Sequence, residues 1–261
     1  MDSEYKKVAL ELAKEAGEIM RKNFMMGMKK EWKEDHSPVT ETDTAINEIV
    51  VKKITEHFPT HSILSEEAED ILQKSEYAWI CDPVDGTHNF AHGIPTSAFA
   101  LALVQDGIPI LGVICDPFLN RIYFAEKGKG ATLNGETIKV SASPSVQKTV
   151  IGIGKWSAGV INLFPVGEAL RERGVRLVTG LSIDYMGALV GAGEFSAILF
   201  GGKDPHDTAA IQIIVEEAGG KATDLFGQNT RYDQKVAGQL ASNGLVHDEI
   251  LEVIKKYGIK V

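Results

Sequence analysis

The chain has 261 residues and a formal charge of −9, because 36 Asp and Glu outweigh 27 Lys and Arg. This balance argues against tight, non-specific binding to a nucleic-acid polymer, which needs clustered cations that release counterions from phosphate. Hydrophobic residues make up 44% and charged residues 24%, a composition that excludes a disordered or fibrous chain and is typical of a folded one.

The cysteines and the apolar segments predict the compartment. Cys81 and Cys115 lie in apolar runs without the spacing of a zinc site, so we expect two buried thiols in a reducing environment. The N-terminal segment is amphipathic and charged, unlike a signal peptide. No segment approaches the roughly 18 apolar residues of a membrane span. We therefore predict a cytoplasmic protein that does not bind a membrane.

The first part of the chain is predicted to hold two helices followed by strands. Apolar residues recur at three- and four-residue spacing from Val8 to Phe24, which predicts one long helix that ends near Gly27. A second helix is expected from near Thr40 until Pro59 stops it. Short apolar runs bounded by turn residues then predict strands at 61–67, 78–83, 98–104, 109–117 and 121–126.

From about residue 149 the pattern alternates between strands and helices. We expect strands at 150–154, 175–179 and 195–200, and helices at 158–172, from 182 onward and at 207–218. This alternation is typical of helices that cover a mixed or parallel sheet. A Ser- and Pro-rich stretch at 141–148 predicts a boundary between an N-terminal α+β subdomain, residues 1–145, and a C-terminal α/β subdomain, residues 146–261.

The segment 79–90, WICDPVDGTHNF, carries the strongest chemical signal. An apolar strand ends at Asp82, Pro83 fixes the chain, and we expect Asp85 to turn back so that both carboxylates meet one cation. Hard ions such as magnesium prefer carboxylates, carbonyls and water. Gly86 lets the backbone approach a ligand, and a helix that starts there would point N–H groups at an anion. Taken alone, however, the D-P-x-D pattern favours an ordinary Asp-Pro turn.

Two further acidic features change this interpretation. Glu66 and Glu67 follow another apolar run, and because neighbouring strand residues point opposite ways, we expect one of them to face a site. Asp207 stands at the start of an apolar helix, where by itself an N-cap would be expected. Together the acidic residues at the ends of elements predict a cage for several cations: Glu66, Asp82, Asp85 and Asp207.

The same residues resemble a known family. Four motifs carry the resemblance: V-T-x-x-D at 39–43, E-E at 66–67, D-P-V-D-G-T-x-N-F at 82–90, and D-x-A-A followed by E-A-G-G at 207–220. In this order and spacing they are similar to the inositol monophosphatase family, and the run 127–135 resembles the family's hairpin. The resemblance implies an α+β or α/β fold, a layered αβαβα sandwich, and a magnesium-dependent, lithium-sensitive phosphatase that acts as a homodimer.

The resemblance also implies a metal site with two or three Mg²⁺ ions. Carried over by motif position, Glu66, Asp82 and the backbone carbonyl of Val84 would bind the first ion. Asp82, Asp85 and Asp207 would hold the second ion. Glu66 and Glu67 would also serve a third ion or act through water.

Catalytic and phosphate-binding residues follow from the same motifs. The resemblance implies that Asp43 and Thr87 orient the attacking water and help to deprotonate it, and Glu66 joins them among the predicted catalytic residues. Without the family pattern, Asp43 is better explained as the capping-box acid of Thr40. Backbone N–H groups of Gly86 and Thr87 are predicted to hold the phosphate.

The sequence departs from the family at the residues that would contact the alcohol part of the substrate. In inositol-preferring members an acidic residue stands seven positions before the last metal aspartate, and here that position is Phe200, which cannot accept those hydrogen bonds. His206 occupies the place of the usual Trp before Asp207. Phe200 is therefore kept as a weak substrate contact together with Ser182 and Asp184, and the last two could equally cap a helix.

Three functions stay open at this point. The first is an inositol monophosphatase that hydrolyses inositol-1-phosphate. The second keeps the chemistry with another small phosphate ester, as in fructose-1,6-bisphosphatase, histidinol-phosphate phosphatase or a nucleotide 3′-phosphatase, and Lys203 and Arg176 are the nearest cations for a second phosphate. The third is a non-catalytic, dimeric binding protein, which we rank last because every metal-site acid and Thr87 are present.

Overall fold

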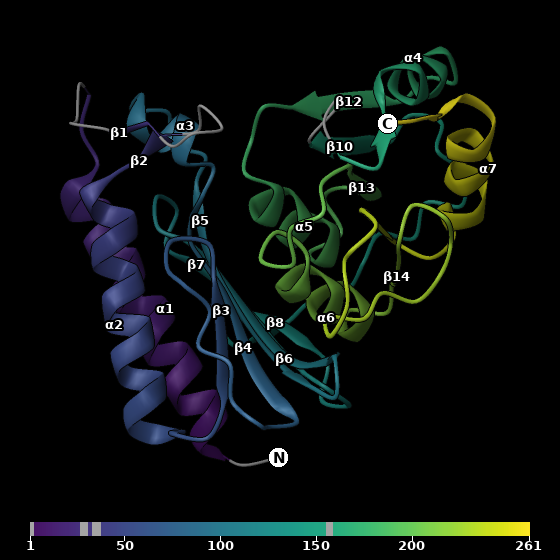
Figure 1. Ribbon diagram of the computed structural model, residues 1–261. Coiled ribbons are helices and arrows are strands. Elements are labelled where there is room, and N and C mark those ends of the chain that lie inside the picture. Colours follow the sequence, from purple (N-terminus) through teal and green to yellow (C-terminus); the bar gives the residue numbers. More distant parts are fainter. Residues whose placement is uncertain (1–2, 27–30, 33–37, 155–158) are drawn as a thin grey trace.

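The computed structural model describes residues 3–26, 31–32, 38–154 and 159–261. Helices and sheets alternate in five layers (Figure 1). Two N-terminal helices cover one face of a seven-stranded sheet, two helices lie between that sheet and a five-stranded sheet, and two more cover the outer face. This order confirms the predicted layered αβαβα sandwich.

The first layer consists of α1 (Ser3–Asn23) and α2 (Glu41–His57). Both helices bury an apolar stripe against the large sheet, as their spacing predicts. Thr40 is the N-cap of α2, and Asp43 completes a capping box because its carboxylate accepts a hydrogen bond from the Thr40 N–H at 3.0 Å. The first helix ends before Gly27, which lies outside the described residues.

The large sheet follows the chain in its strand order, β3-β4-β5-β6-β7-β8-β9. β3 is parallel to β4, and all other neighbours in this sheet are antiparallel. The strands are β3 (Ser62–Ser65), β4 (Tyr77–Asp85), β5 (Ala98–Gln105), β6 (Ile108–Asp116), β7 (Arg121–Glu126), β8 (Ala131–Leu133) and β9 (Glu136–Thr137). The short pair β1 (Glu31–Trp32) and β2 (Pro38–Val39) lies apart from this sheet.

The smaller sheet belongs to the second half of the chain and has the order β12-β10-β13-β15-β14. Its strands are β10 (Val150–Gly154), β12 (Arg176–Thr179), β13 (Ala197–Phe200), β14 (Lys221–Thr223) and β15 (Gln239–Ser242). β10 is parallel to both of its neighbours, whereas β15 is antiparallel to β13 and β14. This is the mixed sheet that the alternating pattern predicts.

Helices cover both faces of the smaller sheet. α5 (Ile183–Gly191) and α6 (Ala209–Glu217) fill the space between the two sheets, and α4 (Phe164–Glu172) and α7 (His247–Tyr257) lie on the outer face (Figure 1). Near α7, β16 (Ile259–Lys260) pairs with β11 (Ile161–Asn162). The helix α3 (Thr87–Ala91) follows β4 directly.

Two glycines allow the middle layer to pack closely on its neighbours. A Cβ atom on Gly112 of β6 would lie 2.4 Å from the side chain of Ile213 on α6. A Cβ atom on Gly187 of α5 would lie 2.5 Å from the side chain of Ile211, also on α6. Distances this short do not occur between real atoms, so α6 can lie where it does only because both positions lack a side chain.

The predicted elements agree with the structure in kind and differ mainly at their ends. The helix expected at 158–172 begins at Phe164, and Pro165 in its first turn explains this start. The helix expected at 207–218 begins at Ala209, because the preceding residues form a turn. Several elements of the structure were not predicted, including α7 and the strands β14 and β15. The subdomain division at residue 145 stays a prediction, and residues 138–149 connect the two sheets.

The described residues contain no helix that combines the length and the apolar character needed to span a membrane.

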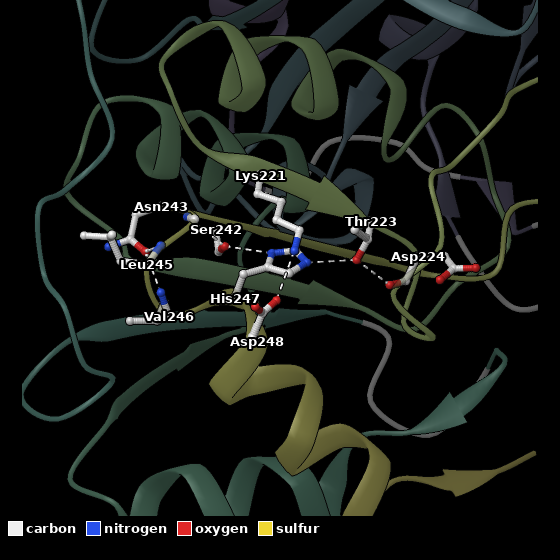
Figure 2. Close-up of polar contacts among 10 residues, drawn as sticks. Lys221, Thr223, Asp224, Ser242, Asn243, Leu245, Val246, His247 and Asp248 are labelled. Atoms are coloured by element: carbon white, nitrogen blue, oxygen red, sulfur yellow. Dashed lines mark hydrogen bonds and ion pairs between the residues drawn. The ribbon is translucent and has the colours of Figure 1, made fainter.

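A buried histidine joins the smaller sheet to α7 (Figure 2). His247 exposes none of its surface, its Nδ1 lies 2.9 Å from Ser242 Oγ, and its Nε2 lies 3.0 Å from Thr223 Oγ1. The Thr223 hydroxyl donates to the carbonyl of Asp224, so it accepts from Nε2–H, and Ser242 then donates to Nδ1. Both ring nitrogens of the neutral imidazole are thereby satisfied.

We predict that acid destabilises the protein through His247. Burial and the nearby Lys221 lower the pKa of His247 to about 4. Since the unfolded chain takes up this proton near pH 6.5, stability is fully present above that pH and falls as the pH drops towards 4, by at most about 3 kcal/mol. The free energy of unfolding of the wild type and of His247→Gln, measured by denaturant titration between pH 7 and 4, checks this. Equal slopes in the two proteins would contradict it.

Candidate active site

Three buried carboxylates meet beside the end of β4. Asp82, Asp85 and Asp207 each offer one oxygen atom, and these atoms all lie within 4.8 Å of one another. The three residues expose 1%, 7% and 9% of their surface. Carboxylate oxygens are the ligands that hard divalent cations prefer. The donor set therefore fits a divalent cation and brings together three residues that the sequence predicted as ligands.

A bulge in β4 explains why Asp82 and Asp85 face the same side. Residues three apart in a regular strand point to opposite faces of the sheet. Here Asp82 pairs with Ala100 and Asp85 pairs with Ala98, so three steps along β4 match two steps along β5. Pro83 has no N–H to donate to the ladder, which suits it to an irregular position. The extra residue returns Asp85 to the face of Asp82.

Asp207 reaches the site from a turn between β13 and α6. The backbone N–H groups of Thr208 and Ala209 donate to the carbonyl of Pro205, at 3.2 and 3.0 Å, and close this turn. Thr208, and not Asp207, is the N-cap of α6. The simpler interpretation of Asp207 as a helix cap is therefore wrong, and its carboxylate contributes to the acidic group instead.

Two hydrogen bonds fix the orientation of Asp85. Ser182 Oγ and the backbone N–H of Asp184 both donate to Asp85 Oδ2, the latter at 2.6 Å. Ser182 Oγ also accepts a hydrogen bond from the N–H of Tyr185 at 2.9 Å, which makes Ser182 the N-cap of α5. The start of α5 in the second half of the chain thus holds a carboxylate of the first half.

Burial leaves this carboxylate cluster in need of a counter-charge. Burial and the nearby Glu66 and Asp85 raise the pKa of Asp82 well above its usual range. Burial also raises the pKa of Asp85 to about 6, although the bonds from Ser182 and Asp184 lower it. A bound cation would stabilise the charged forms and reverse these shifts. The electrostatics therefore support the same conclusion as the donor set.

The two carboxylate oxygens of Asp43 contact two different helices, α2 and α3. One oxygen, Oδ2, accepts hydrogen bonds from the backbone and the hydroxyl of Thr40 and completes the cap of α2. The other oxygen, Oδ1, lies 3.2 Å from Thr87 Oγ1 at the start of α3. The Thr87 hydroxyl also lies 2.9 Å from the carbonyl of Val84, so its single proton has two possible acceptors. Burial raises the pKa of Asp43. Capping and pairing with Thr87 are therefore compatible.

Glu66 lies at the rim of the carboxylate cluster. A carboxylate oxygen of Glu66 groups with Asp82 and a ring nitrogen of His206 within 4.8 Å. Glu67 belongs to no such group among the residues that the structure describes. This difference agrees with the expectation that only one of the two glutamates faces the site. A role of Glu67 toward a third ion stays a prediction.

The three residues predicted as weak substrate contacts are buried in the structure. Phe200 exposes 2% of its surface, and its ring packs in the core between the two sheets, so its contact with substrate stays a prediction. Ser182 and Asp184 expose 1% and 0%, and both contact Asp85. The sequence could not show this, because Phe200 ends a strand whose inward face depends on the pairing of the whole sheet.

Gly86 has a backbone that favours glycine. Its φ is +79°, in the left-handed region, and a Cβ there would lie 3.2 Å from the Cβ of Ser182. This conformation turns the chain from β4 directly into α3, whose first residue is Thr87. Binding of phosphate by the N–H groups of Gly86 and Thr87 stays a prediction.

Asp184 and His206 lie next to the buried acidic residues, and the sequence did not reveal this placement. Both oxygens of Asp184 are buried without a hydrogen-bond partner in the described part of the chain. Burial and the charges of Asp85 and Asp207 raise the pKa of Asp184 well above its usual range. The spacing D-P-H-D, with a histidine directly before the last ligand, was the available signal for His206.

We predict that Asp85→Asn stabilises the metal-free protein and removes its response to divalent cations, because the substitution removes one of several repelling charges and one ligand. In the wild type, Mg²⁺ at about 100 times its dissociation constant should add about 2.7 kcal/mol. Thermal unfolding in chelator and in Mg²⁺ measures both effects, and Asp70→Asn, at an exposed acid, is the control. A variant that still gains stability from Mg²⁺ would show that Asp85 is not a ligand.

Comparison with known proteins identifies the family of this chain. Residues 1–258 match the model of the inositol monophosphatase family. The chain is 37% identical over 218 residues to a fructose-1,6-bisphosphatase/inositol-1-monophosphatase of Thermotoga maritima, covering 84% of this chain and 82% of that protein. It is 32% identical to a histidinol-phosphatase of Chlorobaculum parvum, covering 95% of each chain.

The fold agrees as well. The solved structure of a Thermotoga maritima IMPase superposes with a TM-score of 0.85 at 33% identity, and the match covers 98% of each chain. The family consists of metal-dependent phosphatases, and the acidic groups described above could hold a metal ion. The chain therefore belongs to the inositol monophosphatase family and is a phosphoric monoester hydrolase.

Proposed function

We propose that this phosphatase is Mg²⁺-dependent and hydrolyses a small polyol or sugar monophosphate, with inositol-1-phosphate as its preferred substrate. One observation carries the proposal: the Asp43 and Thr87 pair stands directly beside the buried acids, since Thr87 Oγ1 reaches the carbonyl of Val84, between Asp82 and Asp85. A group that takes up a proton thus lies next to a site that fits cations.

Two cation sites that share Asp82 are proposed. Asp82, Asp85 and Asp207 would hold one ion, and Glu66, Asp82 and the Val84 carbonyl would hold the other. A third, more hydrated ion beside Glu66 and Glu67 is part of the same proposal. When bound, Mg²⁺ supplies positive charge that neutralises the phosphoryl oxygens and lowers the pKa of water.

The protein's own residues then have defined tasks. Thr87 Oγ1 accepts a proton from the attacking water and passes its own proton to Asp43 Oδ1. Burial raises the pKa of Asp43, which suits a carboxylate that takes up a proton. The N–H groups of Gly86 and Thr87 hold phosphate oxygens in line for attack. Hydrolysis of phosphate esters needs little more than such positioning and charge neutralisation.

Lys203 and Arg176 are the cations that the sequence offers for a second phosphate. A cavity of about 560 Å³ adjoins the turn that carries Asp207, and Lys203 and Lys235 lie in its wall together with the acids Glu76, Asp106 and Asp233. The proposed metal-binding and phosphate-binding residues do not line this cavity, so contact of Lys203 with a second phosphate stays a prediction. Arg176, the other predicted cation, lies exposed on β12.

A homodimer, a cytoplasmic location and sensitivity to lithium complete the proposal. The first and the last rest on the family to which the chain belongs. The location is supported by Cys81 and Cys115, which are both buried and unpaired, as expected in a reducing compartment.

A substrate panel tests this proposal. We expect Mg²⁺-dependent phosphate release from inositol-1-phosphate with a kcat/KM at least about tenfold above that for fructose-1,6-bisphosphate, histidinol phosphate and adenosine 3′,5′-bisphosphate. A clear preference for another compound would reassign the substrate within the same chemistry. No release from any compound, with Mg²⁺ shown to bind, would favour the non-catalytic binding protein.

We also predict that Asp43→Asn lowers kcat by about 10² to 10⁴, because it removes the acceptor of the Thr87 proton. Thr40→Ala, which weakens the cap of α2, should cost about 1 kcal/mol of stability and leave most of the turnover. Phosphate release and thermal unfolding of both variants separate the two tasks of Asp43. Equal loss of turnover in both variants would show that Asp43 acts only through the helix cap.

A further inference from the structure

His206 is a nitrogen donor in a site built otherwise from oxygen. It lies in the turn between Lys203 and Thr208, and its side chain is 17% exposed. One ring nitrogen groups with carboxylate oxygens of Glu66 and Asp82 within 4.8 Å. This is the pair of acids that would share the first cation under the proposed function, on which the following inference rests.

The same imidazole also reaches the carboxylates of its own turn. A ring nitrogen of His206 groups with oxygens of Asp204 and Asp207 within 4.8 Å, and its Nε2 lies 3.8 Å from Asp207 Oδ2. A separation of 3.8 Å is too long for a hydrogen bond. Two ligand atoms that each lie about 2.1 Å from one cation lie roughly 3.0 to 3.4 Å from each other. A small rotation of either side chain would bring the His206 nitrogen and the Asp207 oxygen to that separation.

Imidazole changes which cation a site prefers. Mg²⁺ binds oxygen ligands and water, whereas imidazole suits first-row transition metals. As a fourth protein ligand beside Glu66, Asp82 and the Val84 carbonyl, His206 also replaces a water that Mg²⁺ gives up reluctantly, and this replacement favours Mn²⁺ and Co²⁺ over Mg²⁺. The turn also sets the reach of the ring, because the hydrogen bonds to the Pro205 carbonyl fix the backbone on both sides of Asp207.

We propose that His206 is a ligand of the cation held by Glu66 and Asp82, and that it gives this site a preference for a first-row transition-metal ion, Mn²⁺ or Co²⁺, over Mg²⁺. His206, the residue directly before Asp207, then determines which metal ion this one site selects. The phosphatase chemistry stays the same, and the other proposed site, of Asp82, Asp85 and Asp207, keeps its Mg²⁺.

The test is made with the metals alone on the full chain. Calorimetric titrations of the wild type should give tighter binding of Mn²⁺ than of Mg²⁺. In His206→Phe, affinity for Mn²⁺ should fall at least about tenfold, while affinity for Mg²⁺ should change less than twofold. Equal loss for both ions, or no loss for either, would overturn the proposal.

A spectroscopic readout makes the assignment independent of activity. Pulsed electron paramagnetic resonance of bound Mn²⁺ should show modulation from a directly coordinated nitrogen in the wild type and none in His206→Phe. His92→Asn, at an exposed histidine outside the acidic groups, is the control and should keep the signal. Thermal unfolding verifies that the variants fold, and His206→Asn provides a second variant if the phenylalanine disrupts the turn.

The outcomes separate this inference from the proposed function. If Mn²⁺ binds the wild type, Asp85→Asn weakens that binding, and no nitrogen modulation is seen, His206 is not a ligand and the phosphatase site still stands. If the wild type binds neither Mn²⁺ nor Mg²⁺, both the proposed metal site and the role of His206 are refuted.

Discussion

The structure depends on the burial of several like charges in one place. Asp82, Asp85 and Asp184 are almost completely removed from solvent, and burial raises the pKa of all three. Carboxylates in such surroundings stay charged only if a cation or strong donors compensate them. Asp85 receives such donors from Ser182 and the backbone of Asp184, whereas Asp184 itself has none in the described part of the chain. Binding of a cation here would therefore be coupled to the stability of this whole region.

The mutually repelling carboxylates lie where the two halves of the fold meet. The bulged end of β4 brings Asp82 and Asp85 from the seven-stranded sheet, and the turn before α6 brings Asp207 from the second half. α5 fixes the position of Asp85, because its N-cap residue Ser182 donates a hydrogen bond to the Asp85 carboxylate. A cation bound here joins elements from both halves of the chain, so the active site also serves as a structural junction.

Sequence alone predicted which acidic residues gather here and could not predict what surrounds them. The motif around Asp82 is local and so specific that Asp85, Asp207 and Glu66 follow from it by family resemblance. The side on which Phe200 lies, by contrast, depends on strand register, which is set by distant partners. The position of His206 beside Glu66 likewise depends on how two halves of the chain pack, and no local pattern contains that information.

The direct test of the central claim is the number of protons released when Mg²⁺ binds. Calorimetric titration at pH 6 in buffers of different ionisation enthalpy measures it without any substrate. If buried carboxylates hold the cation, Asp85, whose pKa burial raises to about 6, is partly protonated in the metal-free protein and must lose its proton on binding. We expect release at pH 6 that declines at higher pH. Binding of Mg²⁺ at pH 6 with no proton release would contradict a site built from these buried carboxylates.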